Sequence, residues 1–123
     1  MNIKTVWAVY FSGTGTTEKV ATTLAKDLAE RLGAGYDTYC FNLPQAREKD
    51  LSFGPEDLVV LGTPVYAGRV PNLLMPYVRD HIKGNGTLGV PVVLYGNRNY
   101  DDGLIELRNL MRDNGFMPVA AGA

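Results

Sequence analysis

Residues 11–18 read Phe-Ser-Gly-Thr-Gly-Thr-Thr-Glu. This stretch follows the apolar run Val6–Tyr10 and precedes a strongly helical segment, Lys19–Leu32. A strand that enters a helix through a Gly/Thr-rich turn places backbone N–H groups and hydroxyls at the positive end of the helix dipole, where they can bind a phosphate. Because Lys19 is the first cation after the turn, we expect neutral donors to provide most of this binding.

A purely structural role is the alternative, because Ser, Thr and Gly are also typical of simple helix N-caps and tight turns. Three better-known phosphate loops do not match. A Walker loop needs Gly-Lys-Ser/Thr where Glu18-Lys19-Val20 stands, and the dinucleotide fingerprint needs glycine at the position of Glu18. A phosphatase loop needs a cysteine, and Cys40, the only one in the chain, is far from this turn.

Composition narrows the class of protein. A chain of 123 residues suits one domain, so we expect a single domain over residues 1–123. Apolar residues make up 46% and charged residues 20%, which is typical of a soluble globular protein. The net charge of −1 argues against a nucleic-acid or membrane surface, and the single cysteine excludes an internal disulfide. With neither a signal-peptide pattern nor a membrane-spanning run in the sequence, the expected location is the cytoplasm.

Strands and helices are predicted to alternate along the chain. The predicted strands are Ile3–Phe11, Tyr36–Phe41, Leu58–Leu61, Val90–Tyr95 (with Pro91 at its start) and Phe116–Ala121. The predicted helices are Lys19–Leu32, Pro71–Lys83 and Gly103–Asn114. Residues 42–57 are poorly patterned and hold at most one helical turn. This alternation predicts an α/β fold with an open parallel sheet wrapped by helices, in which the more polar second strand lies at an edge.

Apolar spacing indicates which side chains each helix buries. In the first helix Val20, Leu24, Leu28 and Leu32 form one stripe, with Ala21 and Ala25 beside it. In the second helix the inward residues are Leu74, Tyr77 and Val78, and in the third they are Leu104, Leu107 and Met111.

Three polar, glycine-bearing loops follow the first, third and fourth strands. They span residues 12–18, 62–68 and 96–102. In a parallel sheet these loops open on the same edge, and ligands bind there, near the point where the strand order reverses. The agreement of the three loops favours a ligand site at this edge.

The chain resembles the flavodoxin family in three motifs that occur in order and span nearly its whole length. They are Ser12-Gly13-Thr14-Gly15-Thr16-Thr17-Glu18-Lys19, Gly62-Thr63-Pro64-Val65-Tyr66-Ala67-Gly68-Arg69-Val70-Pro71 and Gly96-Asn97-Arg98-Asn99-Tyr100-Asp101-Asp102. The last two are most similar to flavodoxin-like domains of anaerobic bacteria, which are often fused to a ferredoxin domain. The resemblance implies a five-stranded parallel sheet of order 2-1-3-4-5 with helices on both faces.

The resemblance also implies FMN as the cofactor and a set of residues that bind it. Residues 12–17 would hold the phosphate, Tyr100 would stack on the flavin ring, and Tyr66 is the candidate on the opposite wall, with Val65 or Ala67 as alternatives for that contact. The full implied set is Ser12, Gly13, Thr14, Gly15, Thr16, Thr17, Thr63, Pro64, Val65, Tyr66, Ala67, Gly68, Gly96, Asn97, Arg98, Asn99, Tyr100 and Asp102.

The function implied by the resemblance is electron transfer through bound FMN, one or two electrons at a time. The protein would then exchange electrons with a redox partner, such as a ferredoxin-like donor or a reductase. Two alternatives remain open. The first is a small flavoenzyme that reduces quinones or flavins with NAD(P)H, and the second is a binding or assembly module without flavin.

Two features depart from the family pattern. Many flavodoxins are strongly acidic, whereas this chain is nearly neutral and carries Arg69 and Arg98 in the loops expected to border the ring. In addition, the chain stops at residues 118–123, in or just after the fifth strand, where the family has a fifth helix. A sheet face without that helix would expose apolar side chains, so we expect self-association through this face, or a longer natural chain.

Overall fold

The large sheet has the strand order β2-β1-β4-β6-β7, and all its pairs are parallel. The computed structural model describes residues 3–11, 15–42, 45, 48–65, 75–95 and 101–118, with the backbone alone at residues 65, 75, 94, 95 and 101–104. The elements in chain order are β1 (Thr5–Tyr10), α1 (Thr16–Leu32), β2 (Gly35–Cys40), β3 (Leu51–Ser52), β4 (Asp57–Val65), α2 (Met75–His81), β5 (Ile82–Lys83), β6 (Thr87–Tyr95), α3 (Asp101–Asp113) and β7 (Phe116–Pro118).

The strand order confirms the predicted α/β architecture. Counted along the chain, the strands of the large sheet are β1, β2, β4, β6 and β7, so the observed order is 2-1-3-4-5. β2 lies at an edge, as its polar sequence predicts. The order reverses between β1 and β4, because the chain moves from β1 to one side to form β2 and later to the other side to form β4. The described residues contain no helix after β7.

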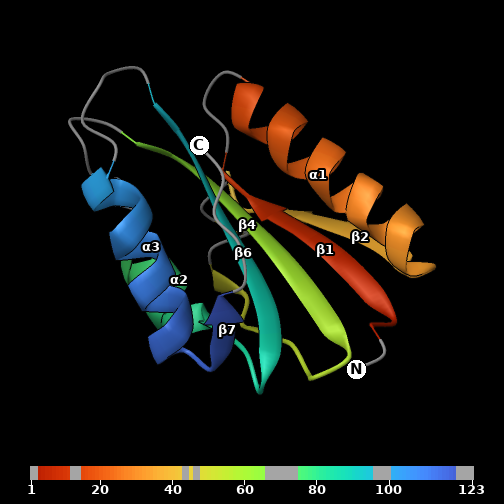
Figure 1. Ribbon diagram of the computed structural model, residues 1–123. Coiled ribbons are helices and arrows are strands. Elements are labelled where there is room, and N and C mark those ends of the chain that lie inside the picture. Colours follow the sequence, from red (N-terminus) through yellow and green to blue (C-terminus); the bar gives the residue numbers. More distant parts are fainter. Residues whose placement is uncertain are drawn as a thin grey trace.

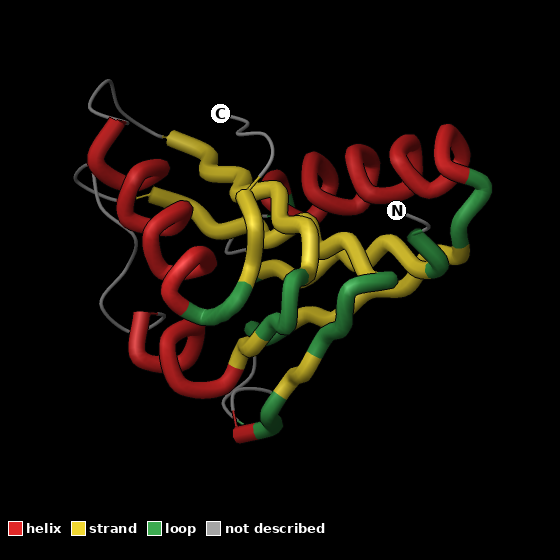
Figure 2. The backbone as a smooth tube through the Cα atoms, turned by 60° about the horizontal axis from the view of Figure 1, so that its bottom comes forward, coloured by secondary structure: helices red, strands yellow, loops and turns green. Residues whose placement is uncertain are grey.

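One face of the sheet is covered by α1, while α2 and α3 lie on the other face (Figure 1 and Figure 2). β1 and β4 are apolar on both faces, as expected for strands in the interior of a parallel sheet. The core on the α1 face includes Val6, Ala8, Tyr10, Leu58, Val60, Val90 and Val92. The core on the α2 and α3 face includes Val9, Phe41, Phe53, Val59, Leu61, Val93 and Phe116.

The face that α1 turns to the sheet is built of small residues. Its buried side chains are Thr17, Ala21, Ala25 and Ala29, spaced four residues apart. The longer side chains of the predicted stripe lie at the margin of this contact instead. Val20, Leu24 and Leu28 are half-buried, and Leu32 is 48% exposed. The helix therefore approaches the sheet closely through alanine and leaves an apolar row at its edge.

The inward residues of the other two helices agree with the sequence. Tyr77 and Val78 of α2 are buried, as are Leu107 and Met111 of α3. Leu74 and the side chain of Leu104 lie outside the described residues.

Several predicted boundaries are wrong, and strand pairing explains two of them. Residues 62–65 were expected in a loop, but they continue β4, because Gly62 to Val65 pair with Val92 to Tyr95 of β6. The second helix was expected to reach Lys83, but α2 ends at His81. Ile82 and Lys83 then form β5, which pairs in parallel with β3, and β3 was not predicted at all.

The remaining differences concern the starts of elements. α1 begins at Thr16 and α3 at Asp101, so both helices start inside predicted loops. β6 begins at Thr87, which places Pro91 inside the strand rather than at its start. The described pairing of β6 with β7 runs from Thr87 to Gly89 and does not include Pro91. Among the described residues, no helix combines the length and apolar character that crossing a bilayer requires.

The turn from α2 into β5 depends on a side chain from the end of α3. The Asn114 side-chain amide donates to the carbonyl oxygens of Val78 at 2.7 Å, Arg79 at 3.1 Å and Ile82 at 2.8 Å. These carbonyls belong to the last turn of α2 and to the residue after it, where carbonyl groups lack N–H donors from the helix itself.

We expect Asn114→Ala to lower the free energy of unfolding by about 1–3 kcal/mol, because it leaves part-buried carbonyls without a donor. Urea unfolding followed by circular dichroism measures this change. The matched control is Asn109→Ala within α3, which should keep or slightly raise stability because alanine is the better helix former. Equal stability of the two variants would contradict the proposed role of Asn114.

Candidate functional site

The carboxyl ends of β1 and β4 meet at the point where the strand order reverses. The register pairs Tyr10 of β1 with Gly62 of β4, and the Phe11 backbone N–H donates to the Gly62 carbonyl at 3.0 Å. From this edge the chain enters α1 on one face after β1, and it reaches α2 on the other face after β4 (Figure 1). Adjacent strands whose following helices go to opposite faces leave room for a ligand between their loops.

The start of α1 forms one side of this edge. Gly15 has a φ of +86°, a left-handed conformation that favours glycine, and α1 begins at the next residue. The first bond of the helix runs from the Lys19 N–H to the Gly15 carbonyl at 3.1 Å. The N–H groups of residues 16–18 precede this ladder and lie in the first turn of the helix. The positive end of the helix dipole therefore lies at this edge of the sheet, where it favours an anion.

Gly62 allows α1 to approach this close to β4. A Cβ atom placed on Gly62 would lie 3.1 Å from Thr17 Cγ2 and 3.1 Å from Ala21 Cβ. Both of these neighbours are buried methyl groups, and the Ala21 methyl group cannot move without moving the helix. The absence of a side chain at this one position on β4 therefore fixes the distance of the first two turns of α1 from the sheet.

Thr63 lies next to Gly62 and points to the opposite face. Side chains alternate along a strand, and Val59 and Leu61 of the same series belong to the core under α2 and α3. Thr63 is fully buried and pairs in register with Val93. Its hydroxyl is the one buried side-chain oxygen among the described residues with no hydrogen-bond partner. A buried hydroxyl without a hydrogen-bond partner lowers the stability of the folded protein. This edge of the sheet therefore holds a hydroxyl that a bound ligand could pair with.

The second buried threonine of the sheet shows the contrast. Thr87 is also fully buried, at the start of β6. Its hydroxyl donates to the Gly54 carbonyl at 2.8 Å and accepts from the Asn85 N–H at 3.1 Å. The hydroxyl without a partner is therefore at the carboxyl end of the sheet, where the predicted ligand site lies.

A buried tyrosine lies near the start of α1. Tyr10, 6% exposed at the end of β1, hydrogen-bonds through its hydroxyl to Glu18 in the first turn of α1. Burial raises the pKa of Tyr10 above 10.0, and the Glu18 carboxylate raises that pKa further, with smaller contributions from Cys40 and Tyr36. Glu18 also favours the helix by its position at the positive end of the dipole.

The structure describes seven of the residues predicted to bind a cofactor, and two of them, Val65 and Asp102, by their backbone alone. Gly15, Thr16 and Thr17 form the start of α1, and Thr63, Pro64 and Val65 are the last residues of β4. The backbone of Asp102 lies in the first turn of α3, on the other face of the sheet from α1 (Figure 1). The remaining predicted residues lie outside the described part of the chain: Ser12, Gly13, Thr14, Tyr66, Ala67, Gly68, Gly96, Asn97, Arg98, Asn99 and Tyr100.

Two features of the site were not predicted. Gly62 belongs to the second family motif, but its contact with Thr17 exists only when β4 and α1 are packed together. The pairing of Tyr10 with Glu18 was also missed, and the alternation of β1, which turns Tyr10 toward the α1 face, is the signal that could have found it.

We expect Gly62→Ala to destabilise the protein by about 1–3 kcal/mol, because the new methyl group overpacks the contact with Thr17 and Ala21. Denaturant unfolding measures this loss. Gly54→Ala is the matched control, since a Cβ there would meet nothing within 4 Å, and it should be neutral or slightly stabilising. A Gly62→Ala protein as stable as wild type would rule out the close contact.

Because the pKa of Tyr10 is raised in the folded state, the stability of the protein should fall at alkaline pH. The folded state holds this proton more tightly than the unfolded state, whose tyrosine has a pKa of about 10. The resulting stability is fully present below about pH 10 and is lost as the pH rises through the higher folded-state pKa. Between about pH 8 and about pH 11, the thermal unfolding midpoint of Tyr10→Phe should therefore fall by less than that of wild type. Parallel midpoint–pH curves for the two proteins would refute this assignment.

Comparison with known proteins places the chain in a family. The family model described as "flavodoxin domain" matches residues 8–99. No curated protein matches the chain. Among solved structures, a proposed flavoprotein from Bacteroides uniformis superposes with a TM-score of 0.60 at 16% identity, over 99% of this chain and 90% of that chain. A proposed flavoprotein from Bacteroides eggerthii gives a TM-score of 0.58 at 18% identity, over 98% and 88% of the two chains.

At these identities the structural matches show a shared fold. The family match covers most of the chain, including the end of β1 and all of α1, β4 and β6, and it agrees with the observed sheet order. The chain belongs to the flavodoxin domain family.

Proposed function

We propose that this protein binds FMN at the carboxyl edge of β1 and β4 and serves as an electron carrier. The observation that carries the proposal is the unpaired hydroxyl of Thr63, at the same edge as the start of α1. Flavodoxins are an established example of flavin binding where the strand order of a parallel sheet reverses. Family membership and the names of the two solved neighbours support a flavin as the ligand.

The start of α1 suits the phosphate of FMN. The left-handed Gly15 leads directly into a helix whose first N–H groups precede the hydrogen-bond ladder, and a phosphate at such a position gains both hydrogen bonds and the helix dipole. Ser12, Gly13 and Thr14 would add further neutral donors. Glu18 in the first turn opposes the phosphate charge, so short neutral hydrogen bonds rather than net charge would carry the affinity.

The ring would be held by the segments after β4 and β6. These strands end side by side, with Val65 paired to Tyr95. Thr63 would supply a hydrogen bond at the base of this region, and Tyr66 and Tyr100 are the proposed aromatic neighbours of the ring. Bound FMN supplies one- or two-electron redox chemistry, and the role of these residues is to bind, orient and shield it.

An electron carrier needs a partner that gives or takes electrons, and we propose a ferredoxin-like donor or a reductase for this role. A flavin reductase or quinone reductase would bind NAD(P)H as well. Oxidation of NADPH by the purified, FMN-loaded protein alone, followed at the absorbance of the reduced nicotinamide, distinguishes the two functions. We expect no turnover without a partner protein.

Titration with FMN, followed by the quenching of flavin fluorescence, tests the cofactor assignment. Riboflavin, which lacks the phosphate, is the matched ligand and should bind at least about tenfold more weakly, because it cannot use the start of α1. Equal affinity for both ligands would contradict the phosphate site. No quenching by either ligand would contradict flavin binding altogether.

Thr63→Val gives a test with two opposite readouts. Valine has a similar shape and removes the unpaired hydroxyl, so the FMN-free protein should become more stable, by about 1 kcal/mol. The affinity for FMN should fall, because a hydrogen bond to the cofactor is lost. Thr87→Val is the control, since its hydroxyl is paired. It should destabilise the protein and leave the affinity of the folded protein unchanged. A Thr63→Val protein that binds FMN as wild type does would exclude Thr63 from the site.

A further inference from the structure

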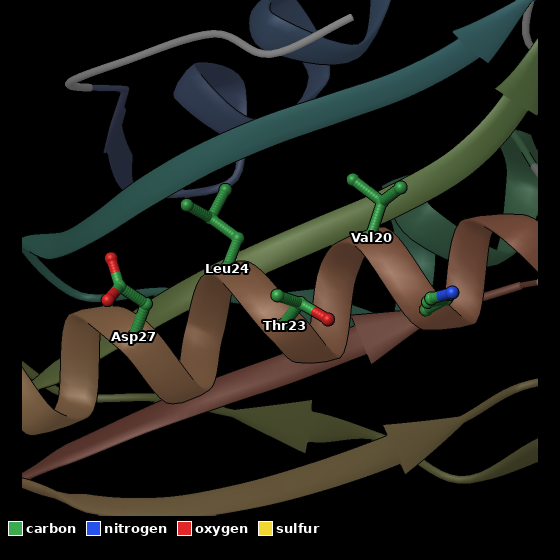
Figure 3. A pocket seen from close by; sticks show the side chains of 5 residues that line it. Val20, Thr23, Leu24 and Asp27 are labelled. Carbon is green, nitrogen blue, oxygen red and sulfur yellow. The ribbon is translucent and has the colours of Figure 1, made fainter.

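A hollow of about 540 Å³ lies along the outer side of α1. Lys19, Val20, Thr23, Leu24 and Asp27 line it. Val20 and Leu24 project from the edge of the helix that faces β4 and β6 (Figure 3). Both side chains are half-buried, while the other three residues are exposed. The hollow therefore has an apolar side next to the sheet and a polar side next to solvent.

The apolar side continues along the helix. Leu28 follows Val20 and Leu24 at four-residue spacing, and all three pack in part against the core on the α1 face, as does Leu88 of β6. The row ends at Leu32, which is 48% exposed. Apolar side chains lined up on a surface in this way are typical of an interaction site.

The polar side of the hollow carries opposite charges at its two ends. Lys19, Thr23 and Asp27 are spaced four residues apart, so they lie in one row along the helix. The row begins with a cation, ends with an anion and has a small neutral residue in its centre. The Asp27 Oδ2 atom accepts from Arg31 Nε at 2.9 Å, and its second carboxylate oxygen is not part of that bond.

This charge pattern is complementary to itself. If a second helix of the same sequence runs antiparallel across the row, with a two-fold axis at Thr23, each Lys19 faces Asp27 of the other copy. Two-fold contacts require this reciprocity, in which residue i meets residue j and j meets i. A parallel arrangement would instead place like charges opposite each other.

The same axis also brings the apolar edges together. Rotation about an axis in the interface and perpendicular to α1 keeps the Val20–Leu24–Leu28 row of both copies on the same side. With a rise of about 1.5 Å per residue, the side chains of one row fall between those of the other, so they can interdigitate. Both the charged and the apolar halves of the hollow are then matched by one symmetry operation.

We propose that this face of α1 binds the same face of a second copy, in an antiparallel, two-fold arrangement centred on Thr23. The occupant of the hollow is thus the helix of the partner copy. The proposal does not depend on the flavin, because the interface and the carboxyl edge of the sheet use different residues.

Sedimentation equilibrium of the flavin-free chain over a range of concentrations tests the proposal. Wild type should form a dimer. Lys19→Asp should weaken the dimer about tenfold or more, because two attractive contacts per dimer become repulsive. Asp27→Lys should do the same. The double variant Lys19→Asp/Asp27→Lys restores the opposite charges and should recover most of the affinity.

Two further variants separate the charged from the apolar part. Arg108→Asp makes the same change of charge as Lys19→Asp, but on the exposed side of α3 across the sheet, and should leave the dimer unchanged. Leu24→Ser should weaken the dimer by about tenfold or more, through lost apolar burial in both copies. Circular dichroism confirms that each variant is folded.

A wild-type chain that remains a monomer at all concentrations would overturn the proposal and would leave the hollow to a different protein or an apolar ligand. A dimer that tolerates Lys19→Asp, or that the double variant fails to restore, would overturn the antiparallel arrangement on α1.

Discussion

Direct contact between α1 and β4 fixes the position of α1 on the sheet. The proposed phosphate site and the outer surface of α1 both depend on this position. Thr17 and Ala21 rest on Gly62, and a side chain at that position would meet both at 3.1 Å. Close packing leaves no slack for such an addition. The contact fixes both the height of the helix over the sheet and the position of its first turn beside the carboxyl ends of β1 and β4. The proposed phosphate site is therefore positioned by the core rather than by the loop alone.

Two adjacent residues of β4 serve different purposes because side chains alternate along a strand. Gly62 faces α1 and allows the helix to approach, whereas Thr63 faces the other side of the sheet and carries a buried hydroxyl without a partner. An apolar residue at Thr63 would be the more stable choice for the protein alone. A stability cost confined to the edge where ligands bind in such sheets is what a binding site predicts.

The small residues under α1 also explain the surface on its outer side. Because Thr17, Ala21, Ala25 and Ala29 make the contact with the sheet, the larger apolar side chains of the helix remain at its edge, only half-buried. They pack only in part against the core on the α1 face, so part of their apolar surface remains exposed. The start of the helix thus adjoins the proposed flavin site, and its outer side carries the face proposed to bind a second copy.

The sequence by itself determined the order of strands and helices, the parallel α/β class and the turn that leads into α1, because these follow from local periodicity and turn residues. It also indicated Thr63 as a site residue through the family motif. Only the tertiary structure decided how far each element extends. Residues 62–65 became strand by pairing with β6, and Ile82 and Lys83 did so by pairing with the distant Leu51 and Ser52. It also decided which stripe of α1 is buried. Hydrophobicity favours the leucines, but the methyl groups of Thr17 and Ala21 are the ones that pack against Gly62. That contact exists only when helix and sheet are packed together.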